Sequence, residues 1–281
     1  MSLIHAFLLG IIEGITEFLP VSSTGHLTIF EKLFGYTVDA PSITAFTAIV
    51  QTGATIATIV YFWHDIVRIV RAWFRGLVRP EARQDTDYRF GWGIIIGTIP
   101  IAIVGLVFKD QIETTFRSLW FVAAALLIWT GVMWLADRYA RTASKRHQEE
   151  KATIKDVLLV GLAQCLALIP GVSRSGATMS VGLLRGFDRL AVTRLSFFLG
   201  IPALLAASGL ETVTKASDIS GGVGWTATIV GTVASFAVAY VVIGWLLRFI
   251  AKHSYQLFIV YRLILGVVLI VLLATHAIAA V

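Results

Sequence analysis

The sequence has little of what a water-soluble protein of its length needs. Only 14% of its 281 residues are charged, whereas 57% are hydrophobic, and the mean hydropathy is +0.82. The longest polar stretch, 137–156, is too short to bury a core of its own. The composition therefore excludes a separate soluble domain and indicates a protein that a lipid bilayer solvates.

Cysteine is nearly absent, since Cys165 is the only one in the chain. This excludes an intramolecular disulfide and a cysteine zinc site, and we interpret Cys165 as a small apolar helix residue. The N-terminus also lacks a basic segment, and its apolar run continues into Glu13 and Glu17 instead of a cleavage site. We therefore expect no removable signal peptide.

Six apolar stretches are long enough to cross a membrane as helices, because one crossing needs about 20 residues. They are 43–63, 90–108, 118–136, 192–210, 225–247 and 255–277. Two further stretches, 3–30 and 157–184, are apolar but contain proline, glycine, hydroxyl and charged residues. Polar non-helical backbone at membrane depth must be covered by protein or line a water-filled cavity. The predicted fold class is an all-α polytopic membrane protein with six transmembrane helices and two re-entrant helix-loop-helix hairpins.

Basic residues are distributed unevenly between the two sides of this predicted fold. Of the 23 lysines and arginines, 17 lie in four segments that we predict to be loops: 64–89, 138–155, 185–194 and 248–252. Because loops rich in lysine and arginine stay cytoplasmic, we expect these four segments inside and both termini outside. The first hairpin then opens outward and the second inward. We therefore attribute the net charge of +6 to the membrane topology, and we expect no nucleic-acid partner.

The two halves of the chain resemble each other. Residues 10–25 align with residues 161–176 at a constant offset of 151, which pairs Glu13 with Gln164 and matches the glycines at both ends. Gly97-Thr98 and Gly231-Thr232 also correspond. Because the two hairpins are predicted to open to opposite sides, this similarity indicates an inverted-topology repeat whose site lies near the membrane midplane.

The repeat also defines the domain organisation. We expect a single membrane domain, 1–281, that contains repeat one at about 1–137 and repeat two at about 156–281. A basic cytoplasmic loop, 138–155, joins them.

Glu13 and Glu17 are spaced four residues apart, which places both carboxylates on one helix face. Two like charges in an apolar stretch need a cation, a shared proton or a basic partner. The spacing suits a divalent metal such as Mg²⁺ or Ca²⁺. The alternative is that the carboxylates extend to the membrane interface.

A cluster of polar residues follows these carboxylates. Pro20 ends the helix, and Ser22 or Ser23 is suited to cap the next one. Capping explains one serine but not the whole cluster. His26 is interpreted as a general acid/base, a nucleophile or a neutral hydrogen-bonding residue.

The second hairpin has the composition of a phosphate-binding loop. Its candidate residues are Gly171, Ser173, Arg174, Ser175 and Thr178. Arg174 offers a bidentate fork, the hydroxyls can donate hydrogen bonds, and the following helix N-terminus favours anions. The competing interpretation, which does not exclude the first, is a salt bridge from Arg174 to Glu13 or Glu17.

Three polar residues inside apolar stretches are secondary candidates. Gln51 and Gln164 are interpreted either as site residues or as interhelical hydrogen-bonding residues. Arg262 is expected to pair with another group or to extend to the membrane interface.

The segments from Glu13 to His26 and from Pro170 to Gly176 resemble the two signature motifs of the bacterial undecaprenyl-diphosphatase, or bacitracin-resistance, family. The resemblance continues through 51–54, 61–63 and 196–199 and so covers essentially the full length. It implies a multi-pass enzyme of the bacterial cytoplasmic membrane that converts undecaprenyl diphosphate to the monophosphate for cell-wall synthesis. It also implies dependence on Mg²⁺ or Ca²⁺.

The resemblance also assigns site positions. The acidic motif falls on Glu13 and Glu17, the serine and histidine positions fall on Ser22, Ser23 and His26, and the arginine motif falls on Ser173, Arg174 and Thr178. The expected partners are undecaprenyl diphosphate and membrane lipid, with a homodimer left open.

The mechanism that we expect begins at the outer face, where Arg174 binds phosphate oxygens and the two carboxylates hold the metal. Ser23, activated by His26 on the same helical turn, is the preferred nucleophile. Ser22, His26 itself and a metal-bound water are the alternatives. The rival function is a polyprenyl-phosphate transporter or flippase, because inverted repeats with broken helices occur in many transporters.

Overall fold

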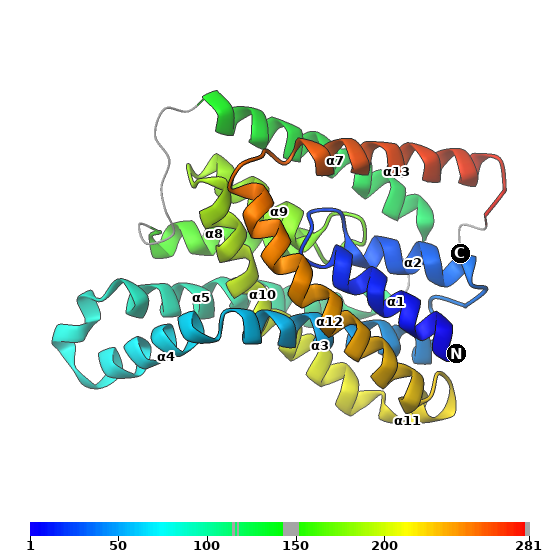
Figure 1. The fold of residues 1–281 in the computed structure, drawn as a ribbon, viewed down its shortest axis with the longest axis horizontal. Helices are drawn as coiled ribbons and strands as arrows, with labels where there is room; N and C mark the ends of the chain where they lie inside the picture. Colours follow the sequence, from blue (N-terminus) through cyan, green and yellow to red (C-terminus); the bar gives the residue numbers. More distant parts are fainter. Residues whose placement is uncertain (114–115, 117, 143–151, 279–281) are drawn as a thin grey trace.

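The computed structural model describes residues 1–113, 116, 118–142 and 152–278, and these residues form helices and turns with no β-strand among them (Figure 1). The first half contains α1 (Leu3–Thr16), α2 (Ser23–Leu33), α3 (Pro41–Tyr61), α4 (Trp63–Val78), the 3₁₀ helix η1 (Pro80–Gln84), α5 (Thr86–Val107), α6 (Lys109–Glu113) and α7 (Leu119–Thr142). The second half contains α8 (Ile154–Leu166), α9 (Arg174–Leu184), α10 (Arg189–Thr214), α11 (Ala216–Gly221), α12 (Trp225–Ile250) and α13 (Gln256–Ala274). The predicted all-α class is confirmed.

Six helices, α3, α5, α7, α10, α12 and α13, are long and apolar enough to cross a bilayer. Each coincides with one predicted span, so the prediction of six apolar helices of span length is confirmed for the described residues. Only 11% of the apolar window of α5 is buried. Its exposed side chains, such as Ile103, therefore form an outer surface that lipid can solvate, as expected for a multi-pass membrane protein.

Two helix pairs are interrupted at Pro20 and Pro170. Residues 17–22 separate α1 from α2, and residues 167–173 separate α8 from α9. The 14 residues of α1 extend for about 21 Å, less than the hydrocarbon thickness of about 30 Å. None of these four helices is therefore long enough to cross a bilayer alone.

Both breaks end in the same uncommon backbone conformation. Ser22 has φ 75° and Ser173 has φ 76°, a left-handed region that costs a non-glycine residue about 1–3 kcal/mol. Each serine caps the following helix, because its Oγ accepts the N–H of Gly25 or Gly176 at 3.3 and 3.1 Å. Two residues that the sequence alignment pairs thus share both conformation and role.

Aligned glycines also make equivalent helix contacts. Gly10 on α1 faces the backbone of Gly231 on α12, and Gly161 on α8 faces the backbone of Gly97 on α5. A Cβ at Gly10 or Gly161 would collide with the facing carbonyl, so both helix pairs approach as closely as glycine allows. Each half of the chain therefore packs its broken helix against a span from the other half.

The interpretation of 64–89 as a loop is wrong at the level of secondary structure. The segment folds into α4 and η1 before α5 begins. A buried row that includes Ile69 and Gly76 packs α4 on α5, where Tyr88 covers Gly76. The predicted loop 138–155 is also shorter than expected, because α7 continues to Thr142; residues 143–151 lie outside the described part.

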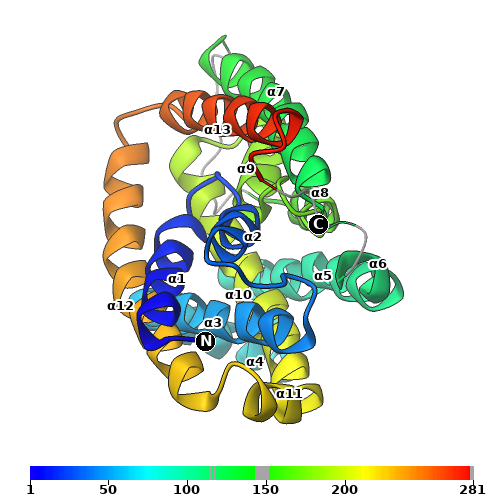
Figure 2. The same cartoon turned by 90° about the vertical axis from the view of Figure 1, so that its right-hand side faces the viewer.

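The two ends of the molecule along its longest axis differ in composition. In Figure 1 the start of α1 and the end of α13 lie at the right, whereas the α4–α5 hairpin, the end of α7 and the start of α8 lie at the left. Figure 2, viewed from the right, shows α2 at the centre, with α1 and α12 on one side and α7 and α13 above. The described residues of the four basic segments therefore lie toward the end opposite the start of α1.

Candidate active site

The two helix breaks meet each other inside the helix bundle. The backbone N–H of Gly171 donates to Ser22 Oγ at 3.0 Å, and the Ser175 hydroxyl donates to the Leu19 carbonyl at 2.9 Å. Gly171 has φ 102°, and a Cβ there would lie 2.5 Å from the Val122 carbonyl oxygen. Glycine is therefore required for this turn to fit between the first break and α7.

Arg262 on α13 joins the two breaks through its guanidinium. It donates to the Pro20 carbonyl at 3.2 Å and to the Gly171 carbonyl at 2.8 Å. It also donates to Thr130 Oγ1 and the Leu126 carbonyl on α7, at 3.2 and 3.3 Å. Because Arg262 is 0% exposed, it does not extend to the membrane interface. The expected pairing is present, but the partners are carbonyl and hydroxyl oxygens.

Glu17 lies at the centre of the site, between the two sequence motifs. Its Oε1 accepts from Arg174 Nη2 at 3.0 Å, and its Oε2 accepts from the Ser23 hydroxyl at 2.6 Å. All three side chains are almost completely buried. One of the two predicted salt bridges of Arg174 is therefore present, and we call Glu17, Arg174 and Ser23 the hub.

Glu13 lies one helical turn before the hub, and Glu17, Arg174 and Glu31 are the charges that act on it. It is 0% exposed, and neither carboxylate oxygen has a hydrogen-bond donor among the described residues. Burying such a group costs free energy unless a proton or cation is bound. Both carboxylate oxygens of Glu13 can therefore bind a cation or share a proton beside the Glu17 carboxylate.

His26 differs from the expected geometry. Its Nδ1 lies 2.7 Å from the Ser22 carbonyl oxygen, and its Nε2 lies 2.6 Å from the Tyr261 hydroxyl. Because a carbonyl only accepts, Nδ1 carries the hydrogen, and in the neutral imidazole Nε2 accepts from Tyr261. The Ser23 hydroxyl bonds to Glu17 instead. The expected activation of Ser23 by His26 is therefore not the arrangement that the structure contains.

The arginine motif surrounds the hub, but its hydroxyl groups already have protein partners. Ser173 and Ser175 share a hydrogen bond of 3.1 Å, and Thr178 donates to the Arg174 carbonyl at 2.8 Å. Arg174 Nη1 donates to the Ser196 carbonyl at 2.7 Å, whereas its buried Nε has no acceptor in the described part of the chain. Among the side chains of the predicted phosphate loop, Arg174 Nε is therefore the buried donor that lacks an acceptor.

The two secondary glutamines have no direct hydrogen bond to the hub. Gln51 is half-buried on α3. Gln164 is fully buried on α8, and neither atom of its amide has a partner among the residues described. It occupies the position that the alignment pairs with Glu13, so both halves carry an unsatisfied polar side chain at the same place. Both glutamines stay candidates.

Sequence reasoning missed four polar residues around the site. They are Glu31, Thr130, Ser196 and Tyr261. Glu31 is buried and accepts from the Thr47 hydroxyl at 2.6 Å. The only sequence signal was that each of these polar residues stands in or beside an apolar stretch, which does not distinguish site residues from interhelical contacts.

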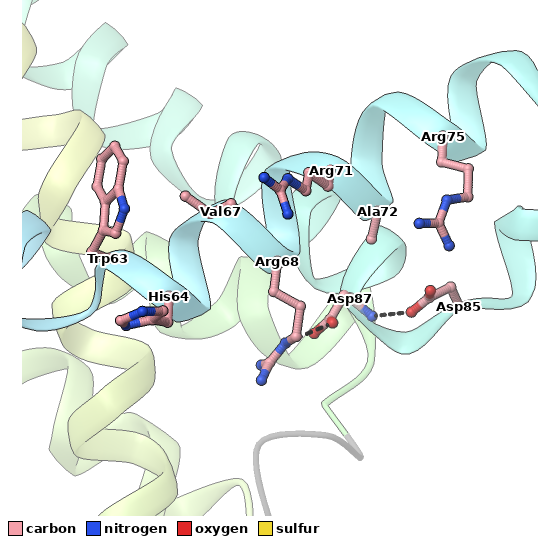
Figure 3. Close-up of a pocket in the computed structure, with 9 residues that line it drawn as sticks. All are labelled: Trp63, His64, Val67, Arg68, Arg71, Ala72, Arg75, Asp85 and Asp87. Atoms are coloured by element: carbon pink, nitrogen blue, oxygen red, sulfur yellow. Dashed lines mark hydrogen bonds and ion pairs between the residues drawn. The ribbon is translucent and has the colours of Figure 1, made fainter.

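A pocket of about 470 Å³ lies elsewhere, along α4 (Figure 3). None of the predicted site residues lines it. The hub is therefore a buried polar centre and not part of this surface recess.

Comparison with known proteins agrees with the motifs. A family model described as bacitracin resistance protein BacA matches residues 6–268. The chain is 61% identical to undecaprenyl-diphosphatase 3 of Frankia casuarinae and 56% identical to the undecaprenyl-diphosphatase of Cutibacterium acnes, in each case over the full length of both chains. It is 53% identical to undecaprenyl-diphosphatase 1 of Streptomyces avermitilis over 96% of both chains. The chain therefore belongs to the BacA family of bacitracin resistance proteins.

Proposed function

We propose that this chain is an integral membrane phosphatase that hydrolyses undecaprenyl diphosphate to undecaprenyl phosphate and inorganic phosphate. The reaction returns the lipid carrier to peptidoglycan synthesis. Family membership and the names of the relatives support this function. The structural observation that carries it is Glu17, whose two carboxylate oxygens bind an anion-binding arginine and a serine hydroxyl.

The hub residues have separate tasks in the proposed reaction. Arg174 binds the terminal phosphate, since Glu17 and the Ser196 carbonyl orient its guanidinium and leave Nε for a ligand. Ser23 Oγ attacks the terminal phosphorus, and the P–O bond to undecaprenyl phosphate breaks as the Oγ–P bond forms. Glu17 accepts the hydroxyl proton. Water then hydrolyses the Oγ–P bond, which releases inorganic phosphate, and Ser23 regains its proton.

The geometry favours Ser23 over the other candidate nucleophiles. Ser22 Oγ already accepts the N–H groups of Gly25 and Gly171. Both ring nitrogens of His26 are also engaged. Ser23 alone among the three donates its hydroxyl hydrogen to a carboxylate, which is the arrangement that proton transfer requires.

We also propose that Glu13 and Glu17 hold a divalent cation, Mg²⁺ or Ca²⁺. The two buried oxygens of Glu13 that lack donors fit this role. The residues described contain no group of three His, Cys, Asp or Glu side chains suited to a metal. Phosphate oxygens and water would complete the coordination, as is usual for magnesium. When bound, the cation would neutralise charge that develops on the transferred phosphate.

Phosphate release from undecaprenyl diphosphate tests both proposals with detergent-purified protein. We expect release in the presence of Mg²⁺ and a decrease of about 100-fold or more after chelation, since the metal contributes several kcal/mol to such reactions. Renewed addition of Mg²⁺ serves as the control and should restore the rate. Absence of release under every condition would refute the phosphatase, whereas a rate insensitive to chelation would refute only the metal.

We propose in addition that the broken helices form two re-entrant hairpins of an inverted-topology repeat, 1–137 and 156–281. The glycine contacts of α1 with α12 and of α8 with α5 support the repeat. The gathering of basic segments at the end opposite α1 supports a bacterial cytoplasmic membrane protein with both termini outside. The hub would then be reached from the outer face.

Cysteine labelling tests this orientation. In a Cys165→Ser background, Arg79→Cys at the end of α4 should react with a membrane-impermeant maleimide only after the cells are permeabilised. Ser217→Cys on α11 is the matched variant and should react in intact cells, because α11 lies at the opposite end. Reaction of position 79 in intact cells would invert the proposed topology.

Lipid transport as the sole function is not favoured. The relatives are named as diphosphatases, and movement of a lipid does not require a serine hydroxyl bonded to a buried carboxylate.

A further inference from the structure

The pocket along α4 contains basic groups that the phosphatase function does not use. Its lining includes Arg68, Arg71 and Arg75 from α4, with Asp85 and Asp87 from the start of α5 (Figure 3). The volume of about 470 Å³ is sufficient for a polar headgroup. Three arginines face two carboxylates, so the pocket carries an excess of positive charge.

The pocket carboxylates, Asp85 and Asp87, contact groups other than Arg71 and Arg75. Arg68 forms ion pairs with Asp65 at 3.1 Å and with Asp87 at 2.8 Å. Asp85 accepts the backbone N–H of Asp87 and so caps α5. Neither Arg71 nor Arg75 has an ion pair or a side-chain hydrogen bond within residues 1–113, 116, 118–142 and 152–278. These two guanidinium groups are thus available to an anionic ligand.

Beside the arginines, α4 exposes a row of apolar side chains. Val70, Phe74 and Val78 are 44%, 59% and 81% exposed and follow one another at intervals of four residues. This spacing places them on one face of the helix, next to the face that carries Arg71 and Arg75. The opposite face is buried against α5. An arginine row that borders an apolar row is typical of helices at a membrane interface.

We propose that the α4 pocket binds the headgroup phosphate of an anionic glycerophospholipid, whose acyl chains lie along Val70, Phe74 and Val78. Arg71 and Arg75 bind the phosphate oxygens, since the guanidinium fork matches phosphate geometry. Charge complementarity and the adjacent apolar row favour a lipid over a free anion. The site is distinct from the hub, because none of its lining residues belongs to either motif.

Native mass spectrometry of the purified protein tests the proposal with three probes: phosphatidylglycerol, phosphatidylcholine and the deacylated headgroup glycerophosphoglycerol. We expect preferential retention of phosphatidylglycerol. Arg71→Gln combined with Arg75→Gln should weaken that retention by about 30-fold, because each interfacial arginine contributes about fivefold. Arg71→Lys combined with Arg75→Lys should restore only part of the binding, because both charges remain but the guanidinium forks are lost.

The matched control removes two arginines at the ends of other spans, Arg138→Gln with Arg248→Gln, and should leave retention unchanged. Phosphate release by each variant verifies that the fold is intact. Equal loss in the control would indicate a general charge effect and overturn the site. Equal binding of the deacylated headgroup would show a simple anion site. Unchanged retention in the Arg71→Gln, Arg75→Gln variant would show that the pocket does not bind this lipid and would favour another ligand, such as an acidic peptide. Either result would refute the lipid assignment.

Discussion

Glu17→Gln is expected to lower kcat for phosphate release by about 10³-fold. Glutamine has the same shape and its amide oxygen still accepts from Arg174, but it has neither the charge nor the basicity to take the Ser23 proton. The structure gives Glu17 both roles, since Arg174 Nη2 lies 3.0 Å from Oε1 and Ser23 Oγ lies 2.6 Å from Oε2. The measurement is single-turnover phosphate release at saturating undecaprenyl diphosphate and Mg²⁺.

The matched control is Glu211→Gln, which also removes a nearly buried, ion-paired carboxylate. Glu211 lies on α10, fifteen residues after Ser196, the residue whose carbonyl binds Arg174. This separation corresponds to about 22 Å along the helix. The control should therefore keep its kcat within about twofold even if its Tm falls. A Glu17→Gln enzyme of normal rate would remove Glu17 from the proposed chemistry.

A comparison of the wild-type and Glu17→Gln enzymes identifies the nucleophile. Rapid quenching of the wild-type reaction in a neutral denaturant, which preserves phosphohistidine as well as phosphoserine, should yield a peptide phosphorylated at Ser23. The Glu17→Gln enzyme should yield none, because the serine keeps its proton. Phosphate on Ser22 or His26 would transfer the nucleophilic role to that residue. Absence of any phosphopeptide in a rapid wild-type reaction would favour direct attack by water.

Much of this site could be predicted from sequence because charged residues are rare within membrane-spanning stretches. Glu13, Glu17 and Arg174 are charges within apolar stretches, and such charges need a partner or a function. The alignment of the two halves then paired Ser22 with Ser173, and the structure gives both serines the same backbone conformation. Residue identity and spacing were sufficient for these inferences.

The contacts of Ser23 could not be predicted in the same way. Spacing on a single helix favours His26 as its partner, because residues three apart are neighbours. The observed partner, Glu17, is the first residue of the break, so the contact depends on how the chain turns between residues 17 and 22. That turn places Ser22 at φ 75°, a conformation that no residue-type preference indicates for serine.

Helix α4 was missed for a different reason. Six arginines in 64–89 lower the average hydropathy and are typical of a cytoplasmic loop, whereas helical structure shows only in the periodicity of the apolar residues. Ile69, Ala72 and Gly76 follow that periodicity and form the buried row against α5. The same arginines are thus both a topology signal and one face of an amphipathic helix.

Arg262→Met is expected to lower the free energy of unfolding by about 3–5 kcal/mol and kcat by about 100-fold. The substitution fills a similar volume but removes all four hydrogen bonds of the guanidinium. It leaves the carbonyls of Pro20 and Gly171 without this buried donor. These carbonyls belong to the two breaks and lie three residues before Ser23 and Arg174. Loss of this connection should let the breaks separate and misplace the hub, which does not contain Arg262 itself.

Thermal unfolding in detergent and phosphate release measure the two effects. Arg262→Lys should recover only part of both, because one ammonium group cannot reach acceptors on α7 and on both breaks in the fixed geometry of the guanidinium. Arg248→Met removes an exposed arginine at the end of α12 and should change neither quantity. A stable Arg262→Met enzyme with normal kcat would show that the breaks hold together without α13. A destabilised enzyme whose kcat is normal below its Tm would limit Arg262 to folding, whereas loss of both identifies it as a positioning residue.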